Sequence, residues 1–76
     1  MTPAETVASE LAEYLGPHTA RAAVRTFAQS SLGMAPEAIR PEDVPRLLSA
    51  LRPMLRTLLG SVICEELLGQ LAREFP

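Results

Sequence analysis

Apolar residues recur along almost the whole chain at intervals of three and four, and no stretch alternates polar and apolar residues long enough to make a convincing strand. Spacing of three and four puts side chains on one face of an α-helix, whereas a half-buried strand requires alternation. Glycines at Gly16, Gly33 and Gly60 interrupt the pattern where helices are expected to end. The sequence therefore predicts an all-α fold, a compact bundle of four or five short helices in one domain over residues 1–76.

The first half of the chain is expected to form a helical hairpin. A helix over residues 3–15 would have Thr2 as its N-cap, and Gly16 would end it. A second helix is expected to run from residue 17 to residue 31 or 32 and to stop at Gly33. Its inner face is predicted to contain Ala20, Ala23, Val24, Phe27, Ala28 and Ser31.

A linker is expected over residues 34–40, with Ala38 and Ile39 as a small apolar anchor. The next helix is expected to start shortly after, with Asp43 as its cap and Pro45 in its first turn. Asp43 suits this position because a short carboxylate side chain accepts hydrogen bonds from the free N–H groups at a helix start.

Pro53 leaves two arrangements open for the second half of the chain. Either one helix kinks there, or a helix ends near Leu51 and a short one begins at Pro53. Because a proline deep inside a helix costs about 3 kcal/mol, we favour a break or a sharp kink. Gly60 then ends this segment, and Ser61 can cap a last helix whose inner stripe includes Cys64.

The two predicted hairpins match one another when the chain is shifted by 44 residues. In this shift Leu11 falls on Leu55 and Gly16 falls on Gly60. The shared pattern is an apolar helix, a glycine and a second helix, as a decayed duplication would leave. Any two leucine-rich hairpins could also align this well about a glycine, so duplication and chance both stay open.

Composition excludes several classes of function. Nine acidic residues against seven arginines, with no lysine, give a net charge of −2. This charge argues against a protein whose main function is to bind polyphosphate. The single cysteine and single histidine cannot form an intrachain disulfide or a complete protein-only zinc site. We therefore expect no metal and no other cofactor.

The titratable residues also give no catalytic set. His18 is expected on the surface near a helix start, and Cys64 in the core as a small apolar residue. No apolar run reaches the ~18–20 residues that span a bilayer, and the N-terminal segment lacks the basic and apolar regions of a signal peptide. The expectation is a cytoplasmic protein that is not an enzyme and does not enter a membrane.

Leucines in the second half spread wider than one inward stripe, which indicates that some are covered by a partner. The sequence thus predicts a protein-interaction or regulatory module that forms a homodimer. Small helical modules that accompany bacterial signalling proteins have this general look, a likeness of fold only. The residues expected at the interface are Leu48, Leu51, Leu55, Leu58 and Leu59.

The alternative is a small DNA-binding transcriptional regulator that uses arginines of the central helices. Residues 21–60 carry six arginines against three acids. Prolines at Pro36, Pro41 and Pro45 would, however, break a recognition helix placed after Gly33, so nucleic-acid binding is not favoured. The basic face in this alternative would consist of Arg21, Arg25, Arg46, Arg52 and Arg56.

Overall fold

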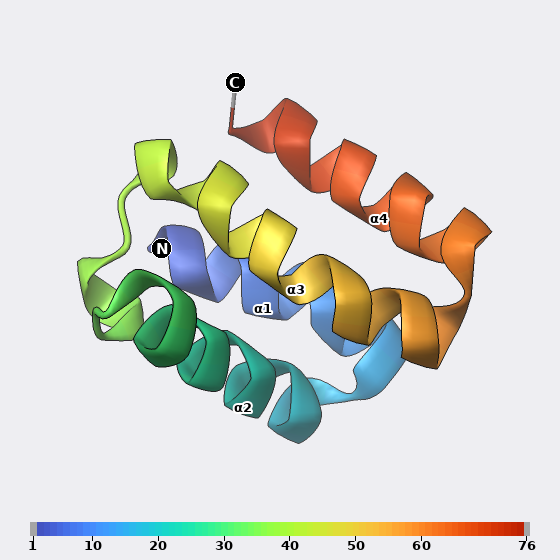
Figure 1. The fold of residues 1–76 in the computed structure, drawn as a ribbon, viewed down its shortest axis with the longest axis horizontal. Helices are drawn as coiled ribbons and strands as arrows, with labels where there is room; N and C mark the ends of the chain where they lie inside the picture. Colours follow the sequence, from blue (N-terminus) through green and yellow to red (C-terminus); the bar gives the residue numbers. More distant parts are fainter. Residues whose placement is uncertain (1, 76) are drawn as a thin grey trace.

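The computed structural model describes residues 2–75 and confirms the all-α fold. Within these residues the α-helices are α1 (Pro3–Leu15), α2 (Pro17–Phe27), α3 (Val44–Leu59) and α4 (Ser61–Glu74). They form two hairpins, since α1 packs mainly on α2 and α3 mainly on α4. The turns of both hairpins lie at the same end of the longest axis of the molecule (Figure 1). No helix within residues 2–75 is long and apolar enough to cross a membrane.

Thr2 caps α1 as predicted. Its hydroxyl accepts a hydrogen bond from the Glu5 N–H at 3.2 Å, and the Glu5 carboxylate accepts one from the Thr2 N–H at 3.1 Å. This reciprocal pair satisfies two N–H groups that the start of a helix leaves free. Two hydrogen bonds with Thr2 lower the pKa of the Glu5 carboxyl, and the bond with the Thr2 backbone has the larger effect.

The two hairpin turns have the same geometry, as the 44-residue shift predicts. Gly16 has φ 85° and ψ 154°, and Gly60 has φ 84° and ψ 162°. Each glycine N–H donates to the carbonyl four residues earlier, of Ala12 at 2.9 Å and of Arg56 at 3.0 Å. Each glycine carbonyl then accepts the first hydrogen bond of the next helix at 3.0 Å. Such backbone angles are open essentially only to glycine, so each turn depends on that residue.

The helical segment after Gly16 extends to Leu32 as predicted, but its last turn, η1 (Ala28–Leu32), is a π-helix. The prediction of Ser31 on the inner face is wrong, since Ser31 is exposed and Leu32 is half-buried against the core. A π-turn takes more residues than an α-turn, which moves the inner position from Ser31 to Leu32. Gly33, in the left-handed region at φ 66°, ends the segment.

The linker contains two 3₁₀ turns, η2 (Pro36–Ala38) and η3 (Pro41–Asp43), and Ile39 between them is buried as an anchor. Asp43 holds the N-cap position of α3, as expected, but the expected capping hydrogen bond from its side chain is absent. Its backbone is already helical, at φ −86° and ψ −15°. Its carboxylate instead accepts from the Arg40 N–H at 3.1 Å, because the chain begins to coil at Pro41.

Pro53 does not end the helix, so the break near Leu51, one of the two favoured arrangements, is wrong. Helix α3 runs from Val44 to Leu59 with Pro53 inside it. The carbonyl that loses its partner belongs to Ser49, which is exposed and accessible to water. Leu51 and Leu55 on either side are fully buried, each contributing roughly 1.5–3 kcal/mol. Together these two leucines contribute roughly 3–6 kcal/mol, which matches or exceeds the cost of about 3 kcal/mol for the proline.

A single apolar core joins all four helices and the linker. Among the residues described it buries no polar or charged side chain. Each hairpin contributes at matched positions of the 44-residue shift, where Leu11 and Leu55 are both fully buried and so are Ala20 and Cys64. The core consists of Ala4, Val7, Leu11, Ala20, Ala23, Val24, Ala28, Ile39, Val44, Leu47, Leu48, Leu51, Leu55, Cys64, Leu67, Leu68 and Leu71.

Candidate interaction surface

Four large apolar side chains are exposed within residues 2–75, and we call them the hairpin-end patch. Their exposed fractions are 44% for Tyr14, 55% for Leu58, 71% for Val62 and 39% for Ile63. They come from the last turns of α1 and α3 and the first turn of α4. These three turns lie at the end of the molecule where both hairpins reverse (Figure 1). Single exposed apolar residues are ordinary, whereas several at one end of a small domain indicate a contact surface.

The path of the chain around Gly60 explains this exposure. Leu58 follows Leu55 by three residues and would continue the buried stripe of α3, but the chain turns away at Gly60 before another element covers it. Val62 and Ile63 precede the inner stripe of α4, which begins at Cys64. The 44-residue shift also places Tyr14 on Leu58, so the two hairpins expose apolar side chains at equivalent positions.

The five leucines expected at the interface are divided by the fold. Leu51 and Leu55 are fully buried, and Leu48 is 7% exposed. Leu51 and Leu55 are therefore unavailable to a partner while the domain stays folded, whereas Leu48 also lines a surface pocket between α3 and α4. Leu58 is exposed and Leu59 is half-buried, so the accessible part of the predicted set lies at the hairpin end.

Sequence reasoning missed Tyr14, Val62 and Ile63 as surface candidates. By helical spacing alone, Tyr14 falls on the inner face of α1 and Ile63 falls beside the inner stripe of α4. Both positions lie at helix ends, where the neighbouring helix no longer covers the stripe. The signal in the sequence that could have indicated their exposure is their nearness to Gly16 or Gly60, because a helix end beside a turn projects beyond the helices packed against it.

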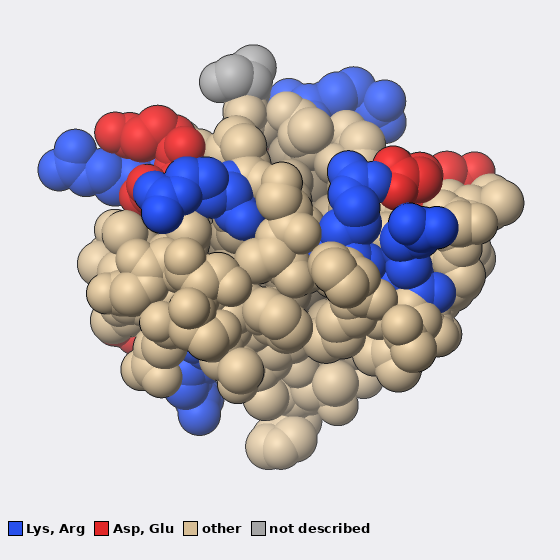
Figure 2. Space-filling model, viewed as in Figure 1, with Lys and Arg blue, Asp and Glu red and all other residues tan. Residues whose placement is uncertain are grey.

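The arginines of the predicted basic face come from two helices, with Arg21 and Arg25 on α2 and the other three on α3. Arg52 forms an ion pair with Glu65, whose hydrogen bond raises the pKa of Arg52. On the face shown in Figure 2 the basic side chains stand in separate groups, two of which lie beside acidic side chains. This interleaving weakens the attraction that a continuous basic face exerts on a phosphate backbone.

His18 and Cys64, the two candidates for nucleophilic or acid–base chemistry, are not brought together in an accessible site. His18 is exposed near the start of α2, and Cys64 is fully buried. The Cys64 Sγ donates a hydrogen bond to the Arg52 carbonyl at 3.7 Å. Burial is the main cause that raises the pKa of the Cys64 thiol, and the negative charge of nearby Glu65 raises it further. Within residues 2–75 no group of three histidine, cysteine or acidic side chains could hold a metal ion.

Burial of Cys64 predicts slow thiol chemistry in the native state. Alkylation by iodoacetamide at neutral pH is expected to require opening of α4, so native protein reacts far more slowly than protein unfolded in urea. Mass spectrometry of timed samples measures both rates, with the unfolded sample as the reference for intrinsic reactivity. Equal rates in the two samples would show that Cys64 is accessible in the folded protein.

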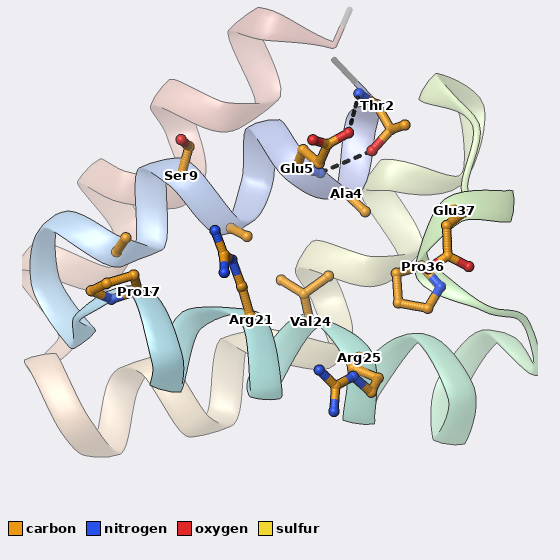
Figure 3. A pocket seen from close by; sticks show the side chains of 12 residues that line it. Thr2, Ala4, Glu5, Ser9, Pro17, Arg21, Val24, Arg25, Pro36 and Glu37 are labelled. Carbon is orange, nitrogen blue, oxygen red and sulfur yellow. Dashed lines mark hydrogen bonds between the residues drawn. The ribbon is translucent and has the colours of Figure 1, made fainter.

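A second surface feature is a groove between α1 and α2, about 510 Å³ in volume (Figure 3). Its apolar part comes from small side chains of α1 and from Val24. Polar side chains stand along its two edges, Arg21 and Arg25 on α2 and Glu5 and Ser9 on α1. The lining residues are Thr2, Ala4, Glu5, Ala8, Ser9, Ala12, Pro17, Arg21, Val24, Arg25, Pro36 and Glu37.

Comparison of the chain with protein-family models, with curated proteins and with solved structures gives no match.

Proposed function

We propose that this protein is a non-catalytic interaction module that self-associates through the hairpin-end patch. The observation that supports the proposal is the gathering of Tyr14, Leu58, Val62 and Ile63 at one end of the bundle. Burying these side chains against a second copy would remove them from water, at roughly 25 cal/mol per Å² of apolar surface. A regulatory role follows if assembly changes which surfaces of the module are free.

The equivalent positions of Tyr14 and Leu58 favour a second copy as the partner. A twofold interface pairs one surface with itself, and a patch built from two similar hairpin turns offers complementary halves to such pairing. The two turns share their backbone angles at Gly16 and Gly60, so the helix ends beside them have the same local geometry. Each copy could then place the α1 end of its patch against the α3–α4 end of the other.

The size of the hairpin-end patch sets the expected affinity of the homodimer. A standard protein–protein interface buries roughly 800 Å² on each partner. The whole described chain exposes 4511 Å², so such an interface would take a substantial share of it. Four partly exposed side chains supply only the centre of an interface of this size, with half-buried Leu15 and Leu59 beside them. We therefore propose a micromolar homodimer rather than an obligate one.

Sedimentation equilibrium tests the proposal. Between about 5 and about 500 micromolar, a span that covers micromolar affinities, the mass should approach twice 8.2 kDa. Val62→Glu should shift the protein to monomer, because it places a charge at the most exposed side chain of the patch. The variant should stay folded, since Val62 is 71% exposed and a carboxylate in the first turn of α4 suits the helix dipole.

Gln70→Glu is the matched control. Gln70 is also exposed on α4, lies outside the hairpin-end patch and receives the same added charge. Its mass distribution should equal that of the parent protein. A monomer at every concentration of the parent, or equal dissociation by both substitutions, would overturn the proposed interface.

A further inference from the structure

The α1–α2 groove runs along small side chains of α1, with nearly buried Ala4 and Val24 at its base and half-buried Ala8 and Ala12 more open to solvent. Ala4, Ala8 and Ala12 follow one another at every fourth position of α1 and line it, so they extend along about 12 Å of helix axis. Val24 and Pro36 complete the apolar lining from the opposite side and from one end. A third helix packs on two others where side chains are small enough to let its own side chains enter between them. The groove is long enough for about two helical turns of an occupant.

The groove is lined by two arginines and two glutamates, and its positive charge is confined to the α2 edge, where Arg21, after the hydrogen bonds with Thr2, also helps to lower the pKa of Glu5. Arg21 and Arg25 stand one helical turn apart on the α2 edge, and neither forms an ion pair within residues 2–75. In Figure 3 the Arg21 side chain extends from α2 towards α1, across the groove. Side chains one turn apart on a helix are about 5–6 Å from each other, so carboxylates four residues apart on an occupying helix match their spacing.

The acidic side chains of the groove fix which way such a helix would face. The Glu5 carboxylate on the α1 edge already accepts the Thr2 N–H, and Figure 3 shows this hydrogen bond beside the groove. Glu37 stands at the end that Pro36 closes. An acidic occupant would therefore direct its carboxylates to the α2 edge and present neutral side chains to the α1 edge, because like charges repel.

We propose that the α1–α2 groove binds an acidic helical segment of a partner protein, whose small side chains enter the groove and whose carboxylates pair with Arg21 and Arg25. Guanidinium groups suit this role because they bind carboxylates through two parallel hydrogen bonds. None of the groove residues belongs to the hairpin-end patch, so this binding goes beyond self-association and does not depend on it.

Fluorescence anisotropy with a labelled model peptide tests the proposal. The probe is a blocked alanine-rich peptide of about 15 residues, long enough to begin forming a helix in water, with glutamate at every fourth position. Saturable binding is expected, and a peptide with glutamine in place of glutamate should bind about tenfold more weakly. Absence of saturable binding of the glutamate peptide, or equal affinity for both peptides, would overturn the proposal.

Substitutions in the protein locate the binding. The double variant Arg21→Gln with Arg25→Gln should weaken binding of the glutamate peptide about tenfold. Arg46→Gln with Arg73→Gln removes the same charge from exposed positions outside the groove and should leave the affinity within about twofold, because salt screens charges beyond about 8 Å. Equal weakening by both pairs would show general charge attraction instead of a groove site.

Two further variants complete the test. Glu37→Gln should tighten binding of the glutamate peptide, because it removes a like charge from the end of the groove. Val62→Glu should leave peptide binding unchanged, which separates this proposal from the self-association proposal. Weaker binding by Glu37→Gln would contradict the proposed orientation of the occupant.

Discussion

Leu55→Glu is expected to unfold the chain, whereas Leu58→Glu, three residues later on the same helix, is expected to leave it folded. Leu55 is fully buried in the core and Leu58 is 55% exposed. A carboxylate at position 55 would lose the leucine packing and would have no partner, since the core holds no polar side chain within residues 2–75. Together these losses exceed about 4 kcal/mol, a large share of the stability of a small domain.

Circular dichroism and thermal unfolding distinguish the two variants. Leu58→Glu should keep the helical signal and a cooperative transition, while Leu55→Glu should lose both at neutral pH. The pair is internally matched, because it introduces the same residue into the same helix one turn apart. Cooperative unfolding of Leu55→Glu would show that position 55 is accessible, and unfolding of Leu58→Glu would place Leu58 in the core.

Glycine substitutions are expected to act in opposite directions at the turns and inside α4. Gly16→Val should destabilise the fold by more than about 1 kcal/mol, and Gly60→Ala by about 1–3 kcal/mol, because both positions have a backbone conformation that L side chains rarely adopt. Gly69→Ala should instead stabilise it by about 0.5–1 kcal/mol, since Gly69 lies within α4 and alanine is the better helix former.

Steric contact does not complicate this comparison. A Cβ atom added at Gly16, Gly60 or Gly69 would meet nothing within 4 Å, so the backbone conformation decides the sign at each position. Urea unfolding followed by circular dichroism gives the three free energies of unfolding. A stabilising Gly60→Ala would show that this turn does not hold a positive φ, and a destabilising Gly69→Ala would show that α4 bends or frays near Gly69.

Local chemistry made much of the fold predictable. The bounds of α1, the start of α2, and the ends at Gly16, Gly33 and Gly60 follow from the residues at those positions. Capping hydrogen bonds and the positive φ of glycine act within a few residues, so neighbours in sequence suffice to specify them. The expected cap of α4 by Ser61 is wrong, since Gly60 is the N-cap, Ser61 is the first helical residue, and no side chain within residues 2–75 caps the helix. The expected capping hydrogen bond of Asp43 also failed, because two successive starts, at Pro41 and Val44, competed for one carboxylate.

Tertiary packing decided the features that local chemistry left open. Helix α3 tolerates Pro53 in its interior because buried leucines on both sides hold it together and the residue that loses its hydrogen-bond partner, Ser49, is exposed. The π-turn at the end of the second segment selects Leu32 over Ser31 for the inner side, which no local spacing rule specifies.

The exposure of the apolar residues likewise depended partly on the sequence and partly on tertiary packing. The spacing of apolar residues shows that segments 44–59 and 61–74 carry more of them than one helical stripe requires, and Gly60 separates the two segments. Only the tertiary structure decided that Leu51 and Leu55 are core while Leu58 and Val62 are exposed. The physical reason is that helical spacing fixes the face on which a side chain lies, whereas burial depends on whether another helix extends far enough to cover that part of the face.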